Sequence, residues 1–282
     1  MSLTEQNQMQ AEDTCSAKEA DVYLCQVGGQ VSCGACCGLY NIRDLSQNKL
    51  EALLAERTGA FVRTPRTIEG IEAFQKKIEG WTPAKRPFAD FYHCPFLGLI
   101  GGNVRRVGCL LHPAAEGNSG TDWRGLSYYG GWACRSYFCP TTRNVPRRYL
   151  QILRSTIDHW YPYGLIVTEQ RLLTAFFVNI EERLGRPVDA ADFAPGSEAT
   201  AVFREFATLK LDWPYRRADA PGPCNYVFDN GQYPRPAVQR LSADIPVSRY
   251  EEIFKELDSG FSSQAELDQA ENRIESLLER LV

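Results

Sequence analysis

Residues 33–37 read Cys-Gly-Ala-Cys-Cys, and three further cysteine motifs follow along the chain. These are Cys94-Pro-Phe-Leu, Cys109-Leu-Leu-His-Pro and the run 134–139, which reads Cys-Arg-Ser-Tyr-Phe-Cys. A Cys-x-x-Cys pair lets two thiolates converge on one ion from a tight turn, and Gly34 is expected to let the backbone bend there. Together the four motifs predict a metal centre assembled from distant parts of the chain.

Ten cysteines in a chain of 282 residues need an explanation. The segment 1–14 is polar and acidic and does not resemble a secretory signal. The longest nearly apolar stretch, 94–102, spans nine residues, whereas about twenty are needed to cross a bilayer. We therefore expect a cytoplasmic protein without a membrane span, in which reducing conditions disfavour a disulfide scaffold and leave thiols for metal binding or redox work. Outside the motifs stand Cys15, Cys25 and Cys224.

The order of the motifs resembles the YkgJ-like family of bacterial cysteine-cluster proteins, which are known as zinc- or iron-chelating domain proteins. The similarity covers roughly residues 30–140. It implies a bound metal, namely iron, an iron–sulfur cluster or zinc, and it implies no particular reaction. The predicted metal ligands are Cys33, Cys36, Cys37, Cys94, Cys109, Cys134 and Cys139.

Two features depart from the pattern of this family. The family's motif opens with a further cysteine three residues before the position of Cys33, where this chain has Gln30. Cys25 or His112 is a possible replacement, and a site of seven cysteines is the remaining alternative. The segment 110–133 is also longer than is usual in the family, and we expect its aromatic residues to form a lid or a pocket wall.

The adjacent pair Cys36 and Cys37 raises a geometric question. Consecutive side chains point in different directions, so we expect these two thiols to bind different centres, or only one of them to bind. Cys33 and Cys36 are expected to face the same ion across one turn. His112 and His93 lie close to cysteines in the sequence and are weaker candidates for ligands.

Basic residues concentrate around the later motifs. The segment 85–154 has a balance of +7, in a chain whose formal net charge is −4. Thiolate-rich centres remain negative after binding iron or zinc, so nearby arginines offset that charge. Arg135, directly after Cys134, is the predicted cofactor-binding residue. The rival interpretation is an anion or nucleic-acid patch, which no recognised nucleic-acid motif supports.

The apolar pattern predicts a mainly α-helical fold with few short strands and a loop-rich cysteine region that is stabilised by metal. The Gly- and Pro-rich segment 81–146 predicts loops, and 211–246 predicts a long irregular stretch. Capping boxes at Ser248 and Ser263 are expected to start the last two helices. Helical spacing of apolar residues predicts helices at 45–58, 68–80, 149–160, 169–184, 198–209 and 264–281.

These patterns divide the chain into three parts. We expect a disordered or extended N-terminus at 1–20, a cysteine-cluster metal-binding region at 21–146, and a helical region at 147–282 that packs on it as one compact unit. The long final helix is expected to pack within its own chain, with a second subunit as the alternative.

Two functions of different classes agree with these features. The first is an iron-binding protein, with iron as an iron–sulfur cluster, that transfers electrons or carries out a redox modification of another molecule. The alternative is a zinc-stabilised module that recognises a protein or peptide without catalysis. A methylase is a third possibility without a methyl-donor site to support it. No other catalytic motif is present, so enzyme activity and the protein or small-molecule partner stay open.

Overall fold

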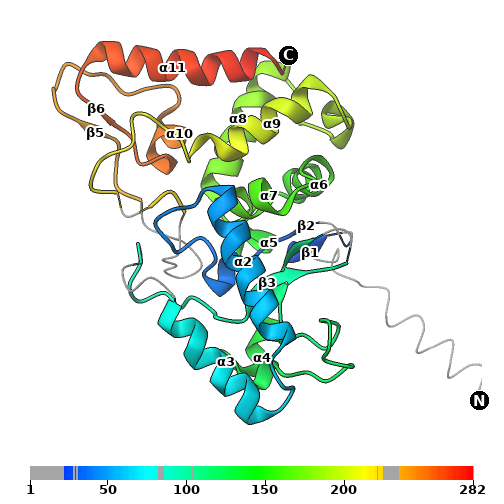
Figure 1. The fold of residues 1–282 in the computed structure, drawn as a ribbon. Helices are drawn as coiled ribbons and strands as arrows, with labels where there is room; N and C mark the ends of the chain where they lie inside the picture. The colour runs from blue at the N-terminus through cyan, green and yellow to red at the C-terminus, as the bar shows by residue number, and fades with distance from the viewer. Residues whose placement is uncertain are drawn as a thin grey trace, which may run out of the picture.

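The computed structural model describes residues 22–27, 29, 31–81, 86–102, 105–220, 222–224 and 235–281. The predicted N-terminal segment 1–20, Cys15 and Gln30 lie outside these ranges. Within them the chain is mainly helical with a few short strands, as the sequence predicted (Figure 1).

The cysteine motifs lie in the first half of the fold, between helices and two short hairpins. One hairpin pairs β1 (Gln26–Val27) with β2 (Val31–Ser32), and the other pairs β3 (Leu97–Ile100) with β4 (Arg106–Cys109), both antiparallel. The helical elements are η1 (Ala35–Cys37), α2 (Gln47–Val62), α3 (Ile68–Trp81), η2 (Arg124–Leu126), α4 (Gly130–Ser136) and α5 (Thr141–Asn144).

The second half is a helical assembly with one short parallel strand pair, β5 (Gln239–Arg240) and β6 (Gly260–Phe261). In Figure 1, α8, α9 and α11 lie at one end of the molecule and α2, α3 and α4 extend toward the other. The helices are α6 (Arg147–Thr156), α7 (Trp160–Ile166), α8 (Gln170–Leu184), η3 (Ala190–Phe193), α9 (Glu198–Leu209), α10 (Glu251–Glu256) and α11 (Gln264–Glu279).

Two details of the predicted helices are wrong. The helix expected at 149–160 is two helices, because the chain becomes extended at Ile157 and the imidazole of His159 accepts a hydrogen bond from the Tyr161 amide, which starts α7. Ser248 is not the N-cap of its helix, since α10 begins only after Tyr250. Ser263 does cap α11, accepting from the amide three residues later as expected.

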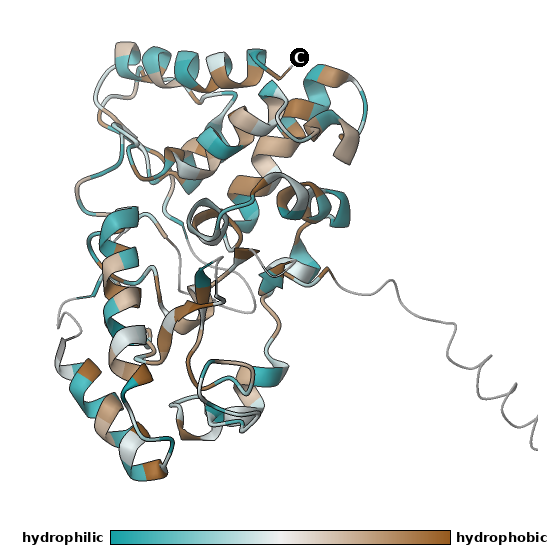
Figure 2. Cartoon of the chain, turned by 45° about the vertical axis from the view of Figure 1, so that its right-hand side comes forward, coloured by the Kyte–Doolittle hydropathy of each residue, from teal (hydrophilic) through white to brown (hydrophobic). Residues whose placement is uncertain are grey.

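Buried side chains form two apolar clusters, and Val22, Leu24 and Val31 around the β1–β2 hairpin belong to the cluster of the helical half. In the helical half, Phe176 of α8 stacks on Phe206 of α9 with ring centroids 4.1 Å apart. In the other half, α2 packs against β3 and α3 packs against α2, where Phe61 meets Phe74 edge to face. Figure 2 shows hydrophobic and hydrophilic residues alternating along these helices, as amphipathic helices require.

Helix α7 contributes side chains to both clusters. Trp160 and Leu165 belong to the cluster around α2 and α3, whereas Ile166 belongs to the helical half. A side chain at Gly164 would place its Cβ 1.7 Å from the Tyr40 hydroxyl, so only glycine lets the helix approach this closely. The two halves are therefore packed together through a shared helix. None of the helices in the described ranges has the length and apolar character needed to span a membrane.

Candidate metal centre

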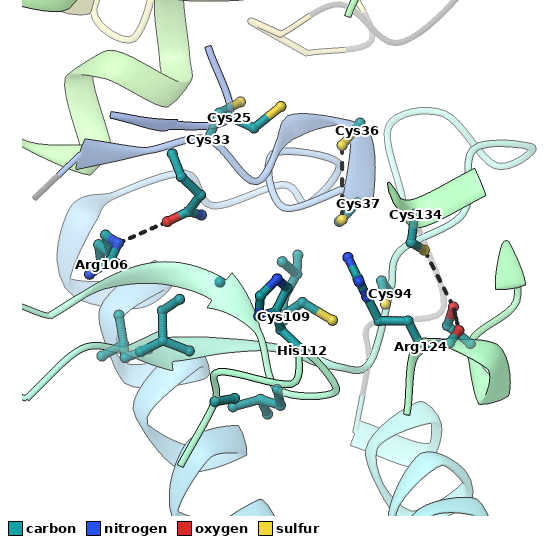
Figure 3. Close-up of a pocket in the computed structure, with 18 of the residues that line it drawn as sticks. Cys25, Cys33, Cys36, Cys37, Cys94, Arg106, Cys109, His112, Arg124 and Cys134 are labelled. Carbon is teal, nitrogen blue, oxygen red and sulfur yellow. Dashed lines mark hydrogen bonds between the residues drawn. The ribbon is translucent and has the colours of Figure 1, made fainter. Parts of the chain in front are cut away.

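Eight cysteines line one cavity of about 980 Å³ in the half of the molecule built on α2 (Figure 3). All seven predicted ligands are among them, although they come from segments more than a hundred residues apart in sequence. The eighth is Cys25, which the sequence offered only as a replacement for a missing ligand. The lining cysteines are Cys25, Cys33, Cys36, Cys37, Cys94, Cys109, Cys134 and Cys139.

The first hairpin places Cys25 opposite Cys33. The Cys33 amide donates to the Cys25 carbonyl oxygen at 3.0 Å, which continues the antiparallel register of β1 and β2 toward η1. The short helix η1 then carries Cys36 and Cys37. The backbone at Gly34 has φ −116° and ψ 11°, which other residues also adopt, so the expected role of this glycine in bending the chain is wrong. Its Cβ would instead meet Val107 at 2.9 Å, so close packing requires glycine.

A backbone contact joins the second motif to the first. The Cys94 amide donates to the Cys37 carbonyl oxygen at 2.8 Å. Gly38 has φ +80°, and a Cβ there would lie 2.2 Å from the Tyr92 carbonyl oxygen. Only glycine therefore allows the 92–94 segment to lie this close to the turn after η1.

A buried arginine holds the same segment from the side of α2. Arg57 donates from Nη1 to the Cys94 carbonyl oxygen at 3.2 Å, and its Nη2 lies 2.9 Å from Nε2 of His93. His93 Nδ1 lies 2.7 Å from the Gly38 carbonyl oxygen, so this nitrogen carries the proton and Nε2 accepts from Arg57. Both imidazole nitrogens are therefore engaged, and His93 has no lone pair to offer a metal ion.

The remaining ligand candidates come from β4 and from the segment that follows it. Cys109 ends β4, Cys134 lies in α4, and Cys139 follows α4. Between Leu111 and Val145, all of which is described, no hydrophobic residue is buried. Of the aromatic residues expected in segment 110–133 to form a pocket wall, Tyr129 lines the cavity, whereas Trp123, Tyr128 and Trp132 are not among the lining residues. Tyr137, which follows that segment, also lines the cavity. The segment 112–144 thus covers the cysteines without an apolar core of its own.

Several cysteine sulfurs accept hydrogen bonds from the backbone. The amide of Ala35 lies 3.3 Å from the Cys33 sulfur, two residues back. The amides of Phe96, Leu111 and Thr141 act in the direction that lowers the pKa of the cysteine two residues before them, which is Cys94, Cys109 or Cys139. Such amides stabilise negative charge on sulfur, so these thiols are placed to act as thiolates.

Burial opposes this effect in the metal-free chain. Desolvation and neighbouring thiolates raise the pKa of Cys25 to about 12. Desolvation is also the main cause that raises the pKa of Cys94 to about 12 and that of Cys109 to about 11. These thiols are therefore protonated at neutral pH unless a cation replaces the proton.

Cys36 and Cys37 behave as a pair. Their sulfurs lie 3.9 Å apart, so the expectation that adjacent side chains would diverge is wrong for this pair. A hydrogen bond from Cys37 lowers the pKa of Cys36, and the same bond, with burial, raises the pKa of Cys37. Cys36 is thus the thiol of the pair that loses its proton first.

The cysteines share a cavity but do not form a closed site for one ion. Two thiolates on one tetrahedral ion lie about 3.8 Å apart, given metal–sulfur bonds of about 2.3 Å. Within the ranges described above, no three His, Cys, Asp or Glu side chains are close enough to hold a single ion together. A bound metal would therefore have to draw these thiols closer or occupy more space than one ion.

Two arginines lie near the later cysteines. Arg135, the predicted cofactor-binding residue, lines the cavity, donates to the Gly131 carbonyl oxygen at 3.2 Å and is largely exposed. Arg124 is more buried, is held by Asp122 at 2.7 Å, and acts electrostatically on Cys109 and Cys134. Of these two arginines, Arg124 is the one whose charge is coupled to the Cys109 and Cys134 thiols, although Arg135 is the closer neighbour in sequence.

Sequence reasoning missed the roles of Arg57 and Arg124 and left Cys25 undecided. A signal for Cys25 was present, because Gly28-Gly29 stands between two Gln-Val pairs, a pattern typical of a hairpin. His112 lines the cavity and accepts from the Ala114 amide through Nδ1 at 3.1 Å.

Comparisons with protein-family models, curated proteins and solved structures found no match for this chain. The resemblance to YkgJ-like proteins therefore rests on the cysteine motifs alone.

Proposed function

We propose that the protein binds iron through the cysteines of this cavity, as an iron–sulfur cluster, and serves in a redox or modification reaction. The observation that carries the proposal is the lining of one cavity by eight thiols from five separate segments. Cytosolic chains use such sets of thiols for metals more often than for disulfides.

The donor set fits an iron–sulfur cluster in two respects. Thiolate is the usual ligand of these clusters. The Cys33 sulfur already accepts an amide hydrogen bond, and backbone amides act to lower the pKa of Cys94, Cys109 and Cys139. The cavity volume of about 980 Å³ also exceeds what a single ion requires. When bound, a cluster supplies one-electron chemistry.

The chain's own residues would hold and screen such a group. Arg57 fixes the segment that carries Cys94, and Arg124 places positive charge beside Cys109 and Cys134. Tyr129 and Tyr137 line the cavity on the side of segment 112–144. The whole cavity, at about 980 Å³, has the size of a small-molecule site.

One observation favours the zinc-stabilised binding module as a second candidate. Segment 112–144 exposes a group of aromatic side chains next to the cavity, with Trp132 exposed by 78% and Tyr128 by 71%. Exposed aromatic residues together with arginine are typical of protein interfaces. In this alternative, metal holds the segment in place and its outer face recognises a partner.

Metal analysis of protein purified without oxygen separates these functions. We expect iron and acid-labile sulfide in the purified chain, with the visible absorption of a cluster. Zinc without colour would support the binding module and contradict the iron proposal. A chain that retains neither metal, after growth with both and after reconstitution with iron and sulfide, would overturn both functions.

The buried Cys224 provides the matched control, because it is not among the residues that line the cavity. Cys224→Ala should keep the full metal content, whereas Cys94→Ala should lose metal. Equal metal content in the two variants would mean that the cavity is not the binding site.

A further inference from the structure

We infer that the cavity also holds a binding site for an organic anion with an apolar body, whose charged group binds at Arg105 and Arg106. The inference rests on the proposed function and deepens it, because it names the class of substrate that would reach the cysteines. The part of the wall formed by Arg105 and Arg106 is called the basic end of the cavity below.

Charge on the cavity wall is mainly positive. Among the described residues that line it are five arginines and one glutamate, whereas lysine and aspartate do not occur there. The glutamate, Glu116, is exposed to solvent. A chain with a formal net charge of −4 thus concentrates positive charge around one cavity, which favours a negatively charged ligand. The lining arginines are Arg66, Arg105, Arg106, Arg124 and Arg135.

Three of these arginines have partners of their own. Arg124 and Arg135 lie 2.7 and 4.0 Å from the carboxylate of Asp122. The guanidinium of Arg66 donates to the Asn118 side chain at 2.8 Å and to three backbone carbonyl oxygens. These arginines add positive charge to the cavity, but their donors are largely engaged within the chain.

Arg106 is held in place by a neutral partner instead. Its Nε donates to the Gln26 side-chain oxygen at 2.8 Å, and the Gln26 amide in turn donates to the Val107 carbonyl oxygen at 3.3 Å. In the part of the chain that the structure describes, neither Arg106 nor its neighbour Arg105 has a carboxylate partner. The two Nη atoms of Arg106 are thus available to a carboxylate or a phosphate, which guanidinium binds through paired hydrogen bonds.

Apolar side chains of the same wall provide a surface for the body of the ligand. Val62, the last residue of α2, lines the cavity although it is 58% exposed. Leu99 and Ile100 of β3 also line it and are half-buried, and Ile100 pairs with Arg106 in the register of β3 and β4. A ligand that covered these side chains would remove apolar surface from water.

The basic end and the cysteines are connected by one strand. Arg106 begins β4 and Cys109 ends it, and three strand steps place their Cα atoms roughly 10 Å apart. Figure 3 shows Arg106 on one side of the cavity, with Cys109 and His112 between it and Arg124. A small molecule that is held by its charged group at the basic end therefore reaches the cysteines with its body.

The basic end is separate from the arginines that act on the thiols. The arginines that lower the pKa values of Cys94 and Cys109 are Arg57 and Arg124. These two cations serve the cysteines, so the charge of the basic end remains available to a ligand.

Two fluorescent probes that differ by one sulfonate test this site. One is 1-anilinonaphthalene-8-sulfonate, an organic anion with an apolar body, and the other is N-phenyl-1-naphthylamine, which lacks the sulfonate. The purified, reduced wild-type chain should bind the sulfonate probe, and added salt should weaken this binding much more than that of the neutral probe. Absence of sulfonate binding, or equal effects of salt on both probes, would overturn the inference without any variant.

Arg106→Gln removes one charge from the basic end. This variant should bind the sulfonate probe about 10- to 100-fold more weakly, as expected for the loss of a charge-assisted hydrogen bond, and the neutral probe as the wild type does. Arg106→Lys should retain more sulfonate affinity than Arg106→Gln. Arg43→Gln is the matched control, because Arg43 is exposed and is not among the residues that line the cavity. Unchanged sulfonate affinity in Arg106→Gln, or an equal loss in Arg43→Gln, would contradict a site at the basic end.

Val62→Ser tests whether the apolar body lies in the cavity. Val62 is exposed, so this change should leave the fold intact and weaken both probes by similar factors. If both affinities stayed at the wild-type value, the probes would bind elsewhere and the inference would fall.

Competition identifies the charged group of the ligand. Octanoate and octyl phosphate should displace the sulfonate probe, whereas octanol at the same concentration should not. The more effective of the two anions indicates whether the site prefers a carboxylate or a phosphate. Displacement by octanol as effective as that by both anions would overturn the inference.

Failure of this inference and failure of the proposed function give different results. A chain that contains iron but binds the sulfonate probe independently of Arg106 keeps the proposed function and loses this site. A chain without metal whose sulfonate binding depends on Arg106 keeps the anion site and loses the proposed function, since probe binding requires no metal.

Discussion

Gly38→Ala tests the contact that joins the first two cysteine motifs. The residue has φ +80°, and an added Cβ would lie 2.2 Å from the Tyr92 carbonyl oxygen. The 92–94 segment must therefore move away from the turn after η1, or the turn must change its conformation.

The cost follows from the contacts that this movement removes. A side chain in the left-handed region costs about 1–2 kcal/mol. Displacement also weakens the bond from His93 to the Gly38 carbonyl oxygen and the bond from Cys94 to the Cys37 carbonyl oxygen, each with a net value of about 0.5–1.5 kcal/mol. The free energy of unfolding should thus fall by about 2–5 kcal/mol.

Urea unfolding of the metal-free, reduced chain, followed by circular dichroism, measures this change. Gly59→Ala is the matched control, because Gly59 lies inside α2 with no atom within 4 Å of its added Cβ. That variant should be stabilised by about 0.5–1 kcal/mol. If Gly38→Ala unfolded within about 0.5 kcal/mol of the wild type, the close approach of the 92–94 segment would be refuted.

Three further outcomes are expected. Hydrogen exchange in segment 112–144 should accelerate on chelation more than in α8, because this segment buries no hydrophobic residue; equal responses would contradict a structural role of metal. The hydrogen bond from Arg148 lowers the pKa of Glu181 to about 2 from 4.5, so its stabilisation is present above pH 4.5 and is lost as pH falls toward 2. Glu181→Gln should reduce the pH dependence of the free energy of unfolding in that range. An unchanged pH dependence would show that the pair of Arg148 and Glu181 does not cause it. Arg57→Met should lower the unfolding free energy by about 2–4 kcal/mol, measured in urea, since it leaves the Cys94 carbonyl oxygen without its donor; a neutral result would argue against that contact.

Helix positions were largely predictable from the sequence, because apolar residues at helical spacing face the two clusters. The break between α6 and α7 was not predicted, although Pro162 lies in the first turn of α7, where its missing amide is tolerated. Apolar spacing continues through the break, since both sides of it are buried. The periodicity of apolar residues therefore predicted one helix where the structure has two, α6 and α7.

The candidate site was predictable as a set of residues but not as an arrangement. The order of the motifs predicted that seven cysteines would gather, and they line one cavity. The pairing of Cys25 with Cys33 depends on a hairpin, and the buried position of Arg57 depends on packing between α2 and the 92–94 segment. Contacts of this kind join residues far apart in sequence, so local patterns do not encode them.

The shared helix α7 limits how this architecture can be divided. A fragment that stopped at residue 146 would contain every cysteine of the cavity but would lack Trp160 and Leu165 from the cluster beneath it. The apolar side chains that Trp160 and Leu165 cover would become exposed to water. Tyr40 would also lose the helix that packs against its hydroxyl. The β1–β2 hairpin also packs on the helical half through Val22, Leu24 and Val31, so the cysteine-bearing half is not a transplantable module.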